Sequence, residues 1–153
     1  MKNKTAPDDI FKLGLGFMAS KTLLSAIELG LFTELAKGPR DADALRVYMG
    51  LHPRSSADFL DALVALGMLD RKGGKYKNTT ATNTFLDKNK PSYMGGILEM
   101  CNARLFGFWN TLTEGLKTGQ PQNEAKHGGE KVVFLDGKPM ILRRDFDTSG
   151  LHI

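Results

Sequence analysis

Apolar residues in segment 21–78 recur with a helical period. The first stretch places them at i, i+1, i+4, i+8, i+9 and i+12, one face of a helix: Leu23, Leu24, Ile27, Leu31, Phe32 and Leu35. This stripe predicts a helix that bends at Gly30. Asp41 is a typical N-cap, so we expect a second, short helix over residues 42–49 that ends at Gly50.

A third helix is predicted from Pro53 onward, ending at Gly67. Its expected inner face is formed by Phe59, Leu60, Leu63, Val64 and Leu66, while Asp58 and Asp61 remain outside. Residues 68–71 and 75–78 then flank Gly73 and Gly74, and a two-glycine loop between extended segments predicts a β-hairpin. Three helices followed by a hairpin are the element order of a winged helix. We therefore predict a mainly α, winged-helix-like domain with a small β-hairpin wing.

An additional helix is expected before this module. Asp8 and Asp9 can cap it, and it starts near Ile10 with an inner face formed by Phe11, Leu15, Met18, Leu23 and Ile27. It contains the pattern G-x-G-x-x-A over residues 14–19, but a dinucleotide-binding loop needs a preceding strand, and only a short polar segment precedes this one. Small residues where one helix packs closely on another are the favoured interpretation.

The segment after the wing is rich in apolar residues. Residues 79–88 form an amphipathic stretch with Phe85 and Leu86 inward, and Pro91 and Ser92 are expected to start a helix. Residues 93–117 carry many aromatic and methionine side chains and predict two helices with a break near Gly107. Such a segment fills a core or an interface, and the alternative, a ligand-contacting wall, stays open. Residues 132–142 predict a second hairpin around an Asp-Gly turn, and residues 143–153 a polar, frayed end.

Composition limits the classes of protein to consider. With 153 residues, 41% of them hydrophobic, the chain has room for one domain and a tail, which we place at residues 8–120 and 121–153. The single Cys101 excludes an internal disulfide and leaves too few thiols for a zinc site. No apolar run approaches the roughly 20 residues that span a bilayer, and no leader follows Met1, so no membrane partner and a cytoplasmic location are expected.

A winged helix also occurs in DNA-binding transcriptional regulators, and this function is the alternative. The net charge of +4 is a mild excess of base. The third helix, which would enter the major groove, has Arg54 against Asp58 and Asp61, and these carboxylates would repel phosphates. The wing is basic, with Arg71, Lys72, Lys75 and Lys77, but a basic wing alone contacts backbone without reading sequence. Nucleic acid is therefore disfavoured as a partner.

An ordered series of motifs over roughly residues 10–124 carries a resemblance to a known family. The motifs are His52-Pro53-Arg54, the run 58–69, Gly74-Lys75-Tyr76, Asn78-Thr79, Phe85-Leu86, Lys90-Pro91-Ser92-Tyr93, Gly96-Ile97-Leu98-Glu99-Met100, Phe108-Trp109 and Gly119-Gln120-Pro121-Gln122-Asn123-Glu124. Together they resemble the N-terminal dimerisation domain of the S-adenosylmethionine-dependent small-molecule O-methyltransferases. A winged helix alone would be weak support, because that fold serves many functions.

The resemblance implies a dimerisation and acceptor-lid domain, active in a homodimer whose N-terminal helix is exchanged between subunits. The full family transfers a methyl group from S-adenosylmethionine to a small-molecule hydroxyl, most often an aromatic one. Four positions carry over as acceptor-binding residues: Met100, Asn102, Phe106 and Trp109. Asn102 would orient a hydroxyl or carbonyl of the acceptor, or would be a helix-surface amide, and both interpretations stay open.

The parts that perform methyl transfer are not found in these residues. The family's glycine-rich donor loop does not occur, and too few residues follow Gln120 to build a donor-binding sheet. His52, His127 and His152 lack a nearby acid that would orient them as a base. We predict no catalytic, cofactor-binding or metal-binding residues, and no S-adenosylmethionine bound by this chain alone. Whether it is a shortened or frameshifted gene product or a stand-alone module stays open.

Overall fold

The computed structural model describes residues 5–123, 131–135 and 138–142, which belong to two compact units, Met1–Asn102 and Ala103–Ile153. The helices and strands of the first unit are α1 (Pro7–Gly14), α2 (Gly16–Glu28), α3 (Leu31–Leu35), β1 (Arg40–Asp41), α4 (Ala42–Met49), α5 (Pro53–Ala65), β2 (Leu69–Lys72), β3 (Lys75–Asn78), α6 (Thr80–Phe85) and α7 (Gly95–Met100). A π-helix, Cys101–Leu105, follows α7. The second unit contains α8 (Phe106–Trp109), α9 (Leu112–Thr118), β4 (Lys131–Leu135) and β5 (Lys138–Leu142).

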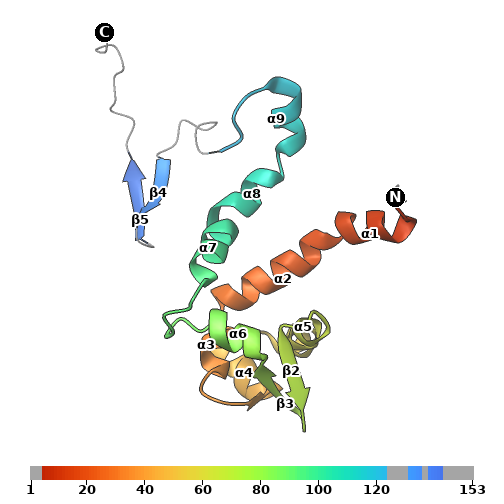
Figure 1. Cartoon of the computed structure of the whole chain (residues 1–153), viewed down its shortest axis with the longest axis vertical. Helices are drawn as coiled ribbons and strands as arrows, with labels where there is room; N and C mark the ends of the chain where they lie inside the picture. Colours follow the sequence, from red (N-terminus) through yellow and green to blue (C-terminus); the bar gives the residue numbers. More distant parts are fainter. Residues whose placement is uncertain (1–4, 124–130, 136–137, 143–153) are drawn as a thin grey trace. The chain divides into compact units, whose positions relative to one another are not determined.

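The first unit is built on a winged-helix module, as predicted. Helices α3, α4, α5 and α6 surround a small antiparallel sheet of order β1-β3-β2, and α1 and α2 extend away from them (Figure 1). The core of the module is formed by Ala26, Ile27, Leu31, Phe32, Leu35, Leu45, Met49, Leu60, Leu63, Leu69, Tyr76 and Leu86. The mainly α fold class is thus confirmed, and α2 is anchored in the core by its C-terminal end.

Short-range signals in the sequence set the boundaries of this module. The Asp41 carboxylate accepts a hydrogen bond from the Ala44 backbone N–H at 2.8 Å and starts α4, as predicted. Gly30, with φ of 71°, separates α2 from α3 and produces the predicted bend. Gly73 and Gly74, with φ of 57° and 75°, form the turn between β2 and β3.

Strand β1 was not predicted from the sequence. Its two residues, Arg40 and Asp41, pair antiparallel with Tyr76 and Lys75 of β3. A two-residue strand is too short to produce an alternating pattern. It makes β3 the central strand of the sheet, with β2 on its other side.

Two side chains predicted to point inward are exposed. Leu66 is 39% exposed because it is the C-cap residue of α5, beyond the last turn that faces the core. Phe85, the last residue of α6, is 44% exposed, whereas the adjacent Leu86 is buried. Both corrections concern residues at helix ends, where the 3.6-residue period no longer determines which way a side chain points.

The predicted start and inner face of the N-terminal helix are also corrected. Helix α1 begins at Pro7 with Ala6 as N-cap residue, and Asp9 acts from inside the first turn, accepting from the Ala6 N–H at 3.0 Å. Of the expected inner face, Ile27 is buried, but Phe11, Leu15 and Met18 are exposed. The face is apolar as predicted, yet its first half is not covered by the described residues of the first unit.

Downstream of the wing, the helix boundaries differ from the prediction. Helix α7 begins at Gly95, since Pro91 and Ser92 lie in a turn rather than at a helix start. The break expected at Gly107 lies instead at Asn110 and Thr111, between α8 and α9.

The C-terminal hairpin is confirmed as β4 and β5, whereas its predicted turn, 136–137, and the end, 143–153, lie outside the described residues. The compact units divide after residue 102, and the predicted boundary between residues 120 and 121 remains a prediction.

The 22-residue helical run Pro7–Glu28 meets the length and hydropathy of a membrane span, with mean hydropathy 1.4 over an 18-residue stretch of it. This corrects the expectation that no apolar run is long enough. The same composition is found in a core helix of a globular domain, and the second half of this run contributes Leu24, Ala26 and Ile27 to the buried core. The run therefore has two halves with different environments, one packed and one uncovered.

Deprotonation of Tyr76 is expected to lower the stability of the module at high pH. Burial, followed by the hydrogen bond from its hydroxyl to Asp61 at 2.6 Å, raises its pKa from 10.0 to about 12. The unfolded chain then loses this proton near pH 10 and the folded chain near pH 12. The contribution to the unfolding free energy is thus complete below the lower value and is lost as pH rises between them. Urea unfolding across this range should show a smaller decline in Tyr76→Phe; an equal decline in both proteins would contradict this assignment.

Candidate functional site

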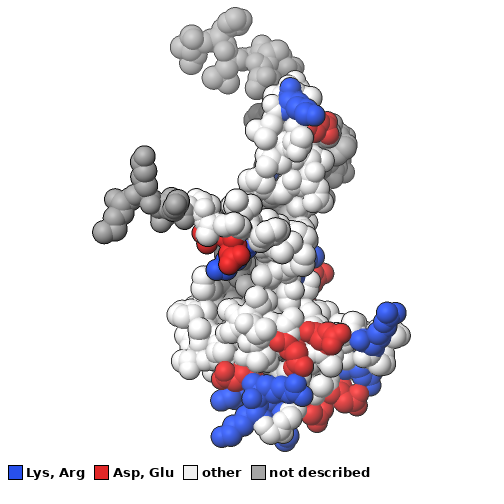
Figure 2. Space-filling model, turned by 90° about the vertical axis from the view of Figure 1, so that its right-hand side faces the viewer, with Lys and Arg blue, Asp and Glu red and all other residues white. Residues whose placement is uncertain are grey.

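The most exposed apolar surface of the first unit lies on α1 and the first half of α2. Six large apolar side chains there are between 51% and 85% exposed: Ile10, Phe11, Leu13, Leu15, Phe17 and Met18. A helix that is apolar on several sides is ordinarily buried. Figure 2 shows that charged side chains gather at the lower end of the visible face, over the winged module. We call these six residues the apolar arm.

Gly14 and Gly16, which lie between residues of the arm, leave space beside the helix. A Cβ atom added at Gly14 or Gly16 would meet no atom within 4 Å. Among the described residues of the first unit, these two glycines therefore do not make the close helix packing that the G-x-G-x-x-A pattern predicted. The arm has both apolar side chains and small residues, a combination that allows close approach of a second helix.

A polar bridge ties α2 to the π-helix. The Lys21 ammonium donates to the Asn102 side-chain oxygen, and the Asn102 side-chain nitrogen donates to Glu28 at 2.6 Å. Lys21 and Glu28 lie seven residues apart, which places them on the same face of α2. Both ends of the Asn102 amide are thus held by charged groups, and α7, just before it, packs against α2.

The π-helix itself is an unusual element. Wide i→i+5 turns are rare and are found mostly inside α-helices, frequently at functional sites. This one carries Asn102 and begins at Cys101, directly after the half-buried Met100 at the end of α7. Two of the four predicted acceptor residues therefore lie at the start of this segment.

A second polar cluster joins the C-terminal part of α7 to the segment that precedes this helix. The Tyr93 hydroxyl donates to Glu99 at 2.7 Å, and Lys88 pairs with the same carboxylate at 2.6 Å. Burial and the bond to Glu99 raise the pKa of Tyr93. Burial by itself would raise the pKa of Glu99, but the hydrogen bonds from Lys88 and Tyr93 outweigh it and lower that pKa. Tyr93 therefore remains a neutral donor and Glu99 a charged acceptor near neutral pH.

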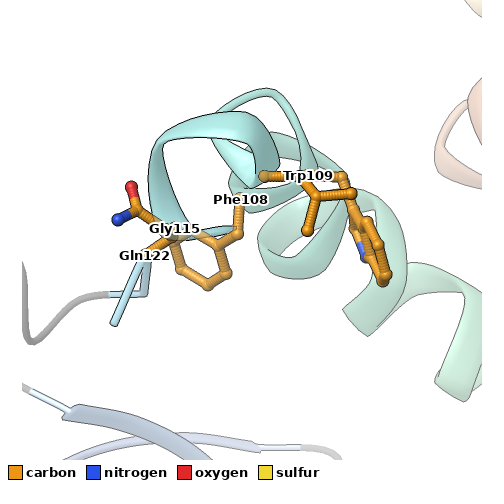
Figure 3. Close-up of a pocket in the computed structure, with 5 residues that line it drawn as sticks. Phe108, Trp109, Gly115 and Gln122 are labelled. Atoms are coloured by element: carbon orange, nitrogen blue, oxygen red, sulfur yellow. The ribbon is translucent and has the colours of Figure 1, made fainter. Parts of the chain in front are cut away.

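The second unit contains an apolar pocket with a volume of about 170 Å³. It is lined by Phe108, Trp109, Leu112, Gly115 and Gln122. Phe108 and Trp109 extend from α8, while Gln122 comes from the segment after α9 (Figure 3). A Cβ at Gly115 would approach Gln122 Cγ to 2.8 Å, so glycine allows this segment to fold back onto α9. The volume is near that of cavities that hold a single benzene-sized ring.

The four predicted acceptor residues are divided between the two units. Met100 and Asn102 belong to the first unit, whereas Phe106 and Trp109 belong to the second. Trp109 lines the pocket and is 66% exposed, and Phe106 is half-buried and is not one of the five lining residues. The assignment of these four residues to an acceptor site remains a prediction.

Several residues of these sites were not predicted from the sequence. Lys21 and Glu28 could have been noticed as the charged positions of an otherwise apolar α2, but only the fold brings Asn102 to them. The pocket residues Leu112 and Gly115 had a signal, since they follow Trp109 at helical spacing, whereas Gln122 had only its place in the family motif over residues 119–124.

Other candidate chemistry receives no support. His52 is the N-cap residue of α5, where its Nδ1 accepts from the Arg54 N–H at 3.2 Å, and His127 and His152 lie outside the described residues. Within the described part of the chain, no three His, Cys, Asp or Glu residues come together as metal ligands. The basic wing is partly neutralised, because Arg71 pairs with Asp61 at 2.9 Å.

Comparison with known proteins gives a consistent result. Residues 11–88 match the model of the O-methyltransferase dimerisation domain. The tetracenomycin polyketide synthesis 8-O-methyl transferase TcmO of Streptomyces glaucescens is 46% identical over 123 residues, which cover 80% of this chain and 36% of that protein. The N,N-dimethyltransferase OxyT of Streptomyces rimosus is 34% identical over 122 residues, 79% of this chain and 36% of its own length.

The fold agrees with solved structures. Human N-acetylserotonin methyltransferase in complex with S-adenosylmethionine superposes with a TM-score of 0.68 and 26% identity, over 78% of this chain and 37% of that one. The chain thus spans about a third of the length of these relatives, in every case covering most of its own residues. None of these matches is to a DNA-binding regulator, so the alternative function gains no support from them.

Proposed function

The chain belongs to the O-methyltransferase dimerisation-domain family, and from this premise we propose that it is the dimer-forming and acceptor-lid part of a methyltransferase. In this function it pairs with a second copy through the apolar arm. The methyl donor of the whole enzyme is proposed to be S-adenosylmethionine and the acceptor a small molecule with a hydroxyl group. The exposed apolar arm is the observation on which the proposal chiefly depends.

A protein partner explains the arm better than a bilayer does. The exposed part of the helical run is short, and Asp8, Asp9 and Lys12 lie within or beside it. In the second half of the run, Lys21 and Glu28 are engaged with Asn102. Charged groups at both ends of the arm are costly in hydrocarbon, whereas at the rim of a protein interface they remain hydrated.

The acceptor residues are proposed for each unit by itself. In the second unit, Trp109 lines the pocket and is 66% exposed, and a flat apolar ligand would contact its ring face, since aromatic rings prefer stacked or edge-on neighbours. Phe106, at the start of α8, is proposed as a second contact in this unit. In the first unit, the half-buried Met100 at the end of α7 offers an adaptable apolar contact.

Sedimentation velocity of the 153-residue chain tests the dimer. We expect a single dimeric species at micromolar concentration, converting to monomer on dilution. Isothermal titration with S-adenosylmethionine of the same preparation should give no binding heat. A folded monomer at 50 µM would contradict the proposed pairing, whereas micromolar donor binding would show that this chain contains a donor site.

A further inference from the structure

We propose that Lys21 and Glu28 are positioning residues, which fix the Asn102 amide and through it the register of the π-helix Cys101–Leu105. This inference rests on the proposed function, because it concerns the segment to which the acceptor contacts are assigned. It also gives Asn102 a role in the scaffold, in which its amide joins α2 to the π-helix.

The π-helix needs support from outside its own backbone. Its i→i+5 turns are less favourable than α-helical ones, so an isolated segment of this length would revert to α-helix. A fixed contact from another element can therefore stabilise the wider turns. Asn102 makes such a contact, from the second residue of the π-helix to α2.

Charged groups fix the Asn102 amide at both ends. Its oxygen accepts from the Lys21 ammonium, and its nitrogen donates to the Glu28 carboxylate at 2.6 Å. Hydrogen bonds to charged groups are about twice as strong as neutral ones. An amide has a second lone pair and a second N–H, so a ligand hydroxyl would meet Asn102 in the orientation that these two bonds impose.

The bridge joins a cation to an anion through the two different ends of one amide. Exchanging the two charges therefore tests it. An amide has an acceptor at one end and a donor at the other, so it can join one cation to one anion in either order by a flip. Lys21→Glu leaves two carboxylates facing the amide, and Glu28→Lys leaves two ammonium groups. Each single variant can satisfy only one end of Asn102. The double variant Lys21→Glu/Glu28→Lys restores both bonds after the amide flips.

Cys101 supplies a local readout. It is the single cysteine of the chain, it is half-buried, and it begins the π-helix next to Asn102. The rate at which its thiol reacts with iodoacetamide, a neutral reagent, reports opening of this segment. We expect each single variant to react about tenfold faster than the parent chain, the effect of losing one charge-assisted bond. The double variant should react within about twofold of the parent rate.

The direction of the rate changes separates positioning from electrostatics. If Lys21 and Glu28 acted only through the thiol pKa, the two single variants would change the rate in opposite directions, because they change the local charge oppositely. Such a result, or unchanged rates, would overturn the proposal. A failure of the double variant to recover would overturn it as well, provided that urea unfolding shows the variant to be folded.

A matched control is provided by an ion pair elsewhere in the module. Asp43 and Arg46 pair at 2.8 Å on α4, and the variants Asp43→Lys and Arg46→Glu make the same charge changes there. They should leave the Cys101 rate unchanged. Sedimentation of every sample distinguishes the two proposals: a monomeric parent chain with the predicted rates would overturn the dimer alone, and a dimer with unaffected rates would overturn the bridge alone.

Discussion

Replacing Leu13 and Phe17 by lysine is expected to convert the dimer into a folded monomer. These side chains are 85% and 57% exposed in the single chain and lie four residues apart, on one side of the apolar arm. In a symmetric dimer the change removes four apolar side chains from the interface. At about 1.5 kcal/mol each, the loss is about 6 kcal/mol, or roughly four powers of ten in the dissociation constant.

Sedimentation velocity over a dilution series measures this change, and circular dichroism checks that the helices persist. Val47→Lys is the matched control, since Val47 on α4 is 65% exposed and lies outside the arm. The control should remain as dimeric as the parent chain. Equal dimerisation of the double variant and the parent would show that the interface lies elsewhere, for example on the exposed face of α9.

The winged module and the apolar arm show which features of the fold could be predicted from the sequence and which could not. Local signals are read well from sequence, because an N-cap such as Asp41 or a turn such as Gly73-Gly74 needs only its neighbours in the chain. The apolar face of the arm was also visible. Its exposure did not follow from periodicity, which shows that a face is apolar without showing which chain covers it, and was implied only by the family resemblance through the exchanged N-terminal helix.

The bridge and the pocket depend on long-range placement. Asn102 and Glu28 are 74 residues apart, and no spacing rule connects them. The π-helix was missed for a related reason, since one extra residue in a turn leaves no mark on composition. Trp109 was identified through family likeness, whereas the place of Gln122 in its pocket came from the fold alone.

The acceptor atom is not determined by this domain. Two relatives with similar coverage carry names that differ in the methylated group, an 8-O-methyl transferase and an N,N-dimethyltransferase. Both match over about a third of their length, so the common part is compatible with oxygen and with nitrogen acceptors. A dimerisation and lid role fits this observation, because such a role shapes and closes a site without performing its chemistry.

A pair of phenylalanine substitutions tests the packing of the winged module most strongly. Phe32 is 1% exposed in the core, whereas Phe85, which the sequence pattern placed inward, is 44% exposed at the end of α6. Phe32→Ala should lower the unfolding free energy by about 3–5 kcal/mol, because it removes buried apolar area and leaves a cavity.

Phe85→Ala makes the same chemical change at a half-exposed site, and should lower the unfolding free energy by no more than about 1.5 kcal/mol. Urea unfolding of both variants, at a protein concentration where the parent chain stays dimeric, measures the difference. Because Leu86, and not Phe85, fills the inner position after α6, the order of the two effects is a direct test of the observed helix end. Equal losses would mean that Phe85 is buried in solution, either by the fold or by the second subunit, and repeating the measurement on Leu13→Lys/Phe17→Lys would separate these two cases.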